Sequence, residues 1–234
     1  GSTKFGDSGD DTHQFTGSLF ISGSRIDFDD GKNNVAIGNA AGDAITSGTN
    51  NIAIGLDSST ANTTAAHSIS IGSYALASQT TGGNVYNMAI GNYAMQYLTL
   101  GVGANGSNTA VGHLSMRGSS GNSDQAQFNT AVGRQTLGAI TSGGYNTAMG
   151  VYAGRNITTG HTNVFIGTEA GEAITTQDEC ILIGHQAGTA INSDDADGTV
   201  AIGYTAGAAI TSGESNIAIG YEAMKVHTTG GNNI

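Results

Sequence analysis

A short pattern of hydrophobic and polar residues recurs along almost the whole chain and always ends in glycine. Asn51-Ile52-Ala53-Ile54-Gly55 is a clean copy, in which two branched residues flank a small one. Because successive side chains of a strand point to opposite faces, this alternation predicts a short strand. The closing glycine recurs eleven times at intervals of 17 to 21 residues, at Gly38, Gly55, Gly72, Gly91, Gly112, Gly133, Gly150, Gly167, Gly184, Gly203 and Gly220.

A second segment follows each closing glycine. In the copy that ends at Gly167, Ala170 lies three residues after the glycine and Ile174 seven residues after it. Glycine and β-branched residues are poor helix formers, so the pattern favours two short strands per coil joined by Gly, Asn and Ser turns. One coil cannot bury its branched pair alone, whereas stacked coils bury a continuous core. We therefore predict an all-β protein, a parallel β-solenoid or β-roll over 31–234.

The small residue at the centre of each predicted strand has two interpretations. It is alanine in eight copies, and an uncharged stripe of this kind suits close packing of one rod against an identical rod. The alternative is a thin inner layer beneath the second strand. The first interpretation predicts a homotrimer with its interface on the alanine stripe, formed by Ala36, Ala53, Ala89, Ala110, Ala131, Ala148, Ala201 and Ala218.

Asparagine stands four residues before the closing glycine in eight of the eleven copies. Asparagine tolerates left-handed backbone, and stacked asparagines form hydrogen-bonded ladders. The other copies carry Ser68, Cys180 and Thr199, so we interpret Cys180 as a substitute in the ladder and not as a reactive thiol. The closing glycine is expected to supply a positive φ or close packing between coils.

The amino-acid composition argues against several classes of function. Glycine accounts for 38 of 234 residues, proline and tryptophan are absent, and only 11% of residues are charged. The net charge of −11 argues against nucleic-acid binding, and no apolar run is long enough for a membrane span. A single cysteine excludes an internal disulfide framework. The opening Gly1-Ser2 resembles a cloning scar, and residues 1–30 form a separate N-terminal segment, expected to be extended or β.

Few residues of the sequence suggest a catalytic or metal-binding site. The six histidines are scattered, and no set of nucleophile, base and orienting residue is readable, so we expect no enzyme activity and no cofactor. Two acidic clusters offer oxygen ligands for Ca²⁺, one at 7–11 and one formed by Asp194, Asp195 and Asp197. Neither has the spacing of a known calcium loop, and a solvated turn is the alternative for both.

Four copies are longer than 17 residues, and three of them are consecutive, spanning 73–133. Insertions in a solenoid form loops on one face, which is often the binding face. This predicts a candidate receptor-contact patch, with tolerated loop growth as the alternative. The patch consists of Tyr86, Tyr97, Met116, Arg117 and Phe128.

The Asn-x-Ala-Ile-Gly cadence resembles the head repeats of YadA-like trimeric autotransporter adhesins, and the resemblance covers 33–234. It implies a left-handed β-roll and three chains packed side by side. The longer unit at 143–154 looks even more like repeats of bacteriophage tail-fibre proteins. Residues 5–24 are similar to segments of marine phage structural proteins.

These resemblances imply a homotrimeric tail-fibre segment on a virion, a spacer that contacts a glycan or protein receptor on the host. The alternative is the head of a bacterial trimeric adhesin on the cell surface. The expected partners are therefore further copies of the chain and a surface receptor, with no nucleic acid and no membrane insertion. No heptads of a stalk are visible, and the chain ends at Asn232-Asn233-Ile234, which opens a twelfth copy and indicates a fragment.

Overall fold

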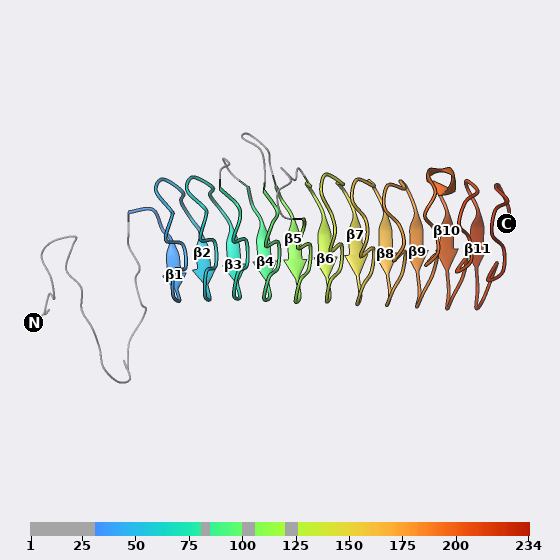
Figure 1. The fold of residues 1–234 in the computed structure, drawn as a ribbon, viewed down its shortest axis with the longest axis horizontal. Coiled ribbons are helices and arrows are strands. Elements are labelled where there is room, and N and C mark those ends of the chain that lie inside the picture. The colour runs from blue at the N-terminus through green and yellow to red at the C-terminus, as the bar shows by residue number, and fades with distance from the viewer. Residues whose placement is uncertain (1–30, 81–84, 100–105, 120–125) are drawn as a thin grey trace, which may run out of the picture.

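The computed structural model describes residues 31–80, 85–99, 106–119 and 126–234. A three-residue strand precedes each closing glycine, and the strands lie side by side along a rod (Figure 1). They are β1 (Val35–Ile37), β2 (Ile52–Ile54), β3 (Ile69–Ile71), β4 (Met88–Ile90), β5 (Thr109–Val111), β6 (Thr130–Val132), β7 (Thr147–Met149), β8 (Val164–Ile166), β9 (Ile181–Ile183), β10 (Val200–Ile202) and β11 (Ile217–Ile219).

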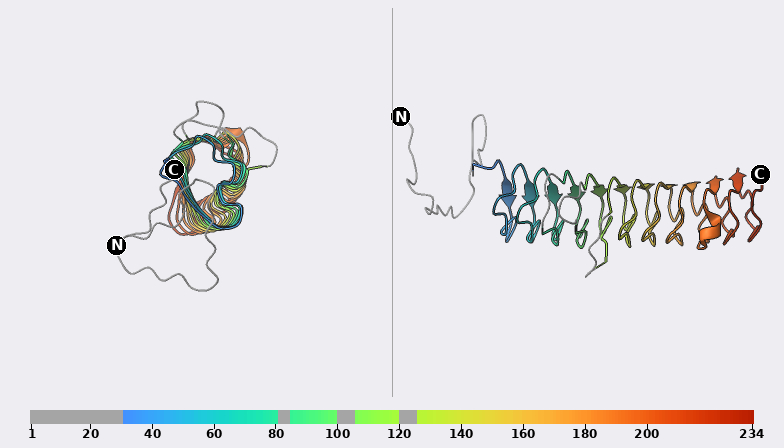
Figure 2. Two further views of the ribbon diagram at one scale, coloured as in Figure 1. Left: turned by 90° about the vertical axis from the view of Figure 1, so that its left-hand side faces the viewer. Right: turned by 90° about the horizontal axis from the view of Figure 1, so that it is seen from above.

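All eleven strands belong to one parallel sheet, in sequence order from β1 to β11. The register pairs equivalent positions of neighbouring coils, so that Ala36 lies opposite Ala53 and Ala201 opposite Ala218. Seen end-on, the coils lie one behind another around a common axis (Figure 2). The predicted parallel β-solenoid is confirmed. Residues 1–30 lie outside the described residues.

The second segment of each coil is a run of tight turns and not the second strand that we expected. Two of its residues take left-handed backbone, as at Tyr152 with φ 62° and Gly154 with φ 56°. Such residues interrupt an extended chain. Its amides nevertheless bond to neighbouring coils: Tyr152 N–H donates to Arg134 O at 3.0 Å, and Gly154 N–H donates to Ala170 O at 2.9 Å.

The core lies on the alanine side of the sheet, which corrects two of our expectations. Ala148 at the centre of β7 is 0% exposed, whereas Met149 beside it is 50% exposed. The branched residues therefore face outward and do not form the core. The alanine stripe is the inner layer and not an interface between rods. The physical reason is space, because side chains of the second segment, such as Leu137 and Ile140, already fill the narrow coil.

Residue sizes within the core compensate for one another. Phe165 and Leu182 replace the usual alanine at the strand centres of β8 and β9, and both are fully buried. Glycines in the second segment give them room: a Cβ on Gly171 would lie 2.8 Å from Phe165 Cδ1 and 2.9 Å from Leu182 Cδ1. Several coils with alanine at the strand centre carry a larger residue at that position, such as Met95 and Leu137, although three of them also have glycine there, at Gly42, Gly154 and Gly207.

The predicted asparagine ladder is confirmed and is internal. Asn146 N–H donates to Asn129 Oδ1 at 2.9 Å, and the Nδ2 group of Asn146 donates to Gly160 O at 2.9 Å. Cys180 continues the ladder, because its N–H donates to Asn163 Oδ1 at 2.9 Å and its thiol donates to Ala196 O at 3.6 Å. Its fully buried side chain occupies a ladder position, as expected.

The closing glycines fulfil both predicted roles. Their φ angles lie between 126° and 139°, a region that residues with a side chain rarely adopt. At Gly150, an added Cβ would lie 2.5 Å from the carbonyl oxygen of Gly167 in the next coil. The glycine column therefore fixes the close approach of successive coils.

Candidate functional site

The structure separates the members of the predicted receptor-contact patch. Met116 is 0% exposed and belongs to the core, so its assignment to a surface patch is wrong. Tyr86 and Phe128 are exposed, and Tyr97 and Arg117 are half-buried. Residues 81–84, 100–105 and 120–125, which make up much of the three insertions, lie outside the described residues. Receptor contact by the exposed members stays a prediction.

Tyr86 and Phe128 occupy equivalent positions directly before the buried asparagine, two coils apart, with Ser107 at this position in the coil between them. Both have left-handed backbone, with φ of 43° and 59°. Tyr86 stacks on His67 and Phe128 stacks on Tyr145, each with ring centroids 5.0 Å apart. Stacked rings of this kind present a large apolar surface with few rotatable bonds, which suits recognition.

A second set of rings lies one or two residues after the closing glycine. The sequence shows the position shared by His113, His185, Tyr204 and Tyr221 and predicts it at the surface or an interface, but it does not predict that the rings stack. Tyr74 stacks on Tyr93 at 5.2 Å. Further along the rod, His185 stacks on Tyr204 at 5.2 Å, and Tyr204 stacks on Tyr221 at 5.3 Å. The recurring place of these rings relative to the closing glycine was the available signal. Parallel in-register coils convert that recurrence into direct contact.

The outward face of the sheet is a flat, uncharged surface. None of the described strands contains a charged residue. Several large apolar side chains are exposed there, with Met149 at 50% and Ile219 at 64%. Exposed apolar side chains that gather on one face often mark interaction sites in soluble proteins. The exposed members on the strands are Ile37, Met149, Ile166, Ile181, Ile217 and Ile219.

Charge is segregated along the chain. Between residues 58 and 168 the only acidic residue is Asp124, while the same segment contains Arg117, Arg134 and Arg155. The other seventeen of the eighteen acidic residues precede or follow it. The middle of the rod is therefore neutral to basic in a chain of net charge −11.

The three arginines stack against tyrosines of the second segment. The guanidinium of Arg117 lies 5.0 Å from the ring centre of Tyr97, and its Nε donates to Gln96 Oε1 at 3.1 Å. Arg134 and Arg155 both pack over Tyr152, at 5.4 and 5.1 Å. These contacts are cation–π interactions, which hold the guanidinium groups in place.

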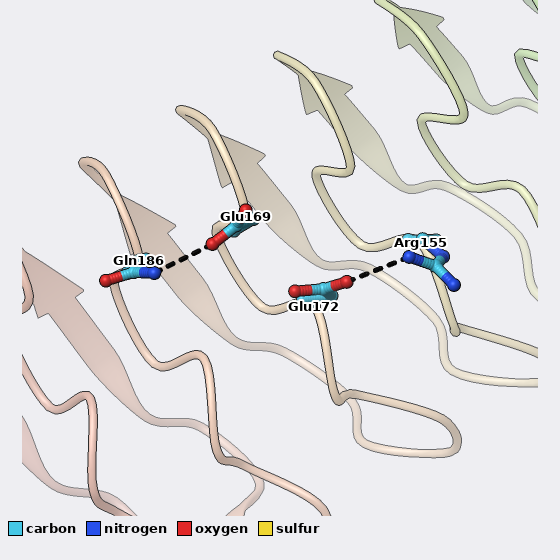
Figure 3. A network of polar contacts seen from close by, with 4 residues as sticks. All are labelled: Arg155, Glu169, Glu172 and Gln186. Carbon is cyan, nitrogen blue, oxygen red and sulfur yellow. Dashed lines mark hydrogen bonds and ion pairs between the residues drawn. The ribbon is translucent and has the colours of Figure 1, made fainter.

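Two separate side-chain contacts join neighbouring coils in this region (Figure 3). Arg155 Nη1 lies 3.2 Å from Glu172 Oε1, and Gln186 Nε2 donates to Glu169 Oε2 at 2.8 Å. Both members of the Arg155–Glu172 ion pair are partly exposed, so solvent screens the interaction and its contribution to stability is small.

A depression of about 140 Å³ lies between two of the arginines. Gly138 lies in the intervening coil, at the position that Arg117 and Arg155 occupy in theirs. The depression is lined by Leu114, Arg117, Gln135, Gly138, Ala139, Arg155 and Asn156.

The acidic cluster near the C-terminal end folds into a short 3₁₀ turn, Asp194–Ala196. The side chain of Asp195 is exposed, and the Oδ1 atom of Asp197 accepts a hydrogen bond from Asp178 N–H at 2.9 Å. No group of three or more His, Cys, Asp or Glu side chains within the described ranges is arranged to hold a metal ion. The cluster at 7–11 lies outside those ranges.

Histidines occupy structural positions where the structure describes them. His113 and His185 belong to the ring stacks, and His161 Nδ1 accepts a hydrogen bond from Gly144 N–H at 2.9 Å.

In the part of the chain that the structure covers, no helix is long and apolar enough to cross a membrane. No family model, curated protein or solved structure matches this chain.

Proposed function

We propose that this chain is a rigid structural and adhesive segment of a bacteriophage tail fibre or another virion-surface spacer, which can contact a host receptor. The observation that supports this most is the single parallel sheet of eleven strands in unbroken sequence order. Ten steps of about 4.8 Å give a rod of about 50 Å. The head of a bacterial trimeric adhesin is the second candidate, because the same cadence and the same rod would serve it.

The direction of the hydrogen bonds suits a mechanical function. The coils are joined by sheet hydrogen bonds and by the buried asparagine ladder, both of which run along the rod. A force along the rod therefore loads many hydrogen bonds at each coil boundary. Such a rod would hold a receptor-binding surface at a fixed distance from the particle.

We further propose that three copies pack side by side through the outward face of the sheet. This replaces the alanine stripe as the interface, because the alanines are buried within each coil. The face has no charged residue in the described strands and is largely apolar, with Thr109, Thr130 and Thr147 in β5 to β7, and an identical rod offers the same surface. Packing would remove Met149, Ile166 and Ile219 from water.

Solution mass tests the trimer. Light scattering at micromolar concentration should give about 70 kDa, three times the chain mass of 23.4 kDa. The double variant Met149→Glu/Ile166→Glu should give a monomer, because both side chains face outward and their charges would be buried only in the trimer. Val226→Glu is the control, an exposed apolar residue outside the strands. A wild-type mass near 23 kDa contradicts the trimer.

Location and attachment test the fibre function. An antibody against the chain should label virion tails if it belongs to a phage, or bacterial surfaces if it belongs to an adhesin. Labelling of neither contradicts both candidates. The purified chain should also bind particular cells saturably, without cleaving any member of a glycan panel. Turnover of a glycan would contradict the non-catalytic part of the proposal.

A further inference from the structure

We propose that Arg117 and Arg155 form a binding site for one carboxylate or sulfate group of an acidic saccharide. The saccharide as the carrier rests on the proposed attachment to cells, whereas the anion site is argued from the structure alone. Three features support it: the spacing of the two arginines, the contacts that orient them, and the scarcity of carboxylates around them.

The spacing comes from the repeat. Arg117, Gly138 and Arg155 each lie five residues after the closing glycine of successive coils. With about 4.8 Å between coils, the two arginines are separated by about 10 Å of backbone. Gly138 leaves the space between them open, since it has no side chain. An oxyanion in this gap can accept hydrogen bonds from both sides.

The guanidinium groups are held before any ligand arrives. Arg117 is fixed by the Tyr97 ring and by Gln96, and Arg155 by the Tyr152 ring. The ring contacts restrict both side chains, so binding costs less side-chain entropy than it would with two free arginines. Gln96 lies in the coil before Arg117 and Glu172 in the coil after Arg155, so an anion in the gap competes with these partners for the guanidinium N–H groups. A guanidinium has five N–H donors in a planar fork that matches carboxylate and sulfate oxygens.

Only one acidic side chain is paired with either arginine within the described ranges. Glu172 contacts Arg155 Nη1 at 3.2 Å, and the exposure of this pair leaves it open to exchange with a stronger anion. The chain has no acidic residue between Asp124 and Glu169, so few carboxylates repel an incoming anion. Charges beyond about 8 Å are largely screened at physiological ionic strength. An anion at the site is therefore affected mainly by the nearby arginines and not by the net charge of −11 of the chain.

The depression is open to solvent and lies on the surface of the rod. One anionic group of a saccharide would occupy it, and the remaining sugar residues would lie on the open surface. The Gln135 and Asn156 amides on the lining add neutral donors.

Calorimetry with defined probes tests the site. The probes are tetragalacturonate, a sulfated galactan tetrasaccharide, fully methyl-esterified tetragalacturonate and sodium sulfate. We expect an anionic saccharide to bind and the neutral ester not to bind. Arg117→Gln/Arg155→Gln should weaken binding at least about tenfold, because two charge-assisted contacts are lost. Lys225→Gln should leave binding unchanged, since this lysine pairs with Glu222 elsewhere on the rod.

A second pair of variants tests the gap without removing either arginine. Gly138→Glu places a carboxylate between the arginines and should abolish binding of the probes. The corresponding position holds Asp43 and Glu172 in other coils, so an acidic side chain is compatible with the fold. Gly138→Ala keeps the gap and should retain binding. Circular dichroism before each titration should show that every variant is folded.

The possible outcomes separate this site from the fibre function. Equal binding by the double arginine variant, or binding of the neutral ester, overturns the anion site. Sodium sulfate binding as tightly as the saccharides overturns the saccharide as the carrier. A chain that attaches to cells but binds no probe overturns the site and leaves the fibre function standing. A chain that binds the probes but attaches to no cell overturns the fibre function and leaves the anion site standing.

Discussion

At the scale of single residues, backbone conformation is conserved between coils more strictly than residue type. The residue two positions after each closing glycine is left-handed in every coil, with φ between 49° and 62°. It is alanine at Ala40, tyrosine at Tyr152 and threonine at Thr205. Left-handed backbone costs a residue with a side chain roughly 1 kcal/mol or more, so hydrogen bonds between coils must offset it. The sequence could not predict this column, because its residue types vary.

Cys180 gives a prediction at the same scale. Burial raises the pKa of its thiol from 9.0 to about 12. Because the thiolate is the nucleophile, we expect a thiol reagent at pH 8 to react with the folded protein at least about a hundredfold more slowly than with the unfolded chain. Absorbance of the released reagent group measures the rate. Similar rates for the folded and the unfolded protein would contradict the buried ladder position.

The same shift predicts a pH dependence of stability. The pKa of the folded state lies above that of the unfolded state, so the stabilising effect of the neutral thiol is complete below pH 9 and is lost between pH 9 and 12. Cys180→Ser is the matched control, because Ser68 occupies the same ladder position in another coil. The stability of the wild type should fall more steeply over this pH range than that of the control.

At the scale of the coil, the sequence predicts the strand and the turns but not which face is inside. The closing glycines locate every strand, because each strand ends at the residue before one of them. Alanine fits a thin core and a close-packed surface equally well. The informative signal was the joint occurrence of Phe165 with Gly154 and Gly171, in which a large side chain at the strand centre requires glycine in the second segment.

That compensation predicts a coupled pair of substitutions. Phe165→Ala should destabilise the protein by about 3–5 kcal/mol, because it empties space in a fully buried site. Gly171→Ala should destabilise the wild type through contact with the Phe165 ring and through its φ of 60°. In the Phe165→Ala background the steric part of that cost should decrease. Urea unfolding of the four proteins measures the coupling energy. Additive effects would contradict the size compensation.

At the scale of the whole molecule, residues far apart in sequence become neighbours only through stacking. Arg117 was identified from its insertion, but Arg155 and Gly138 were not, because they lie in copies of ordinary length. The relation among the three depends on in-register coils, which the structure supplies. The outward sheet face was missed for the related reason that the branched residues were assigned to the core.

A rod in which each coil contacts only its neighbours should also unfold locally. Asn146 is fully buried and joins Asn129, Asn163 and Gly160. Asn146→Ala leaves the N–H of Asn163 and the carbonyl oxygen of Gly160 without their partner, which costs about 2–4 kcal/mol. Because solenoid stability is a sum of repeat and nearest-neighbour contributions, the loss should stay near β7. Hydrogen exchange should therefore accelerate at least about thirtyfold in β6 to β8 and remain unchanged in β1 and β11. The exposed Asn192→Ala is the control, and equal acceleration along the whole rod would show instead that the coils unfold as one cooperative unit.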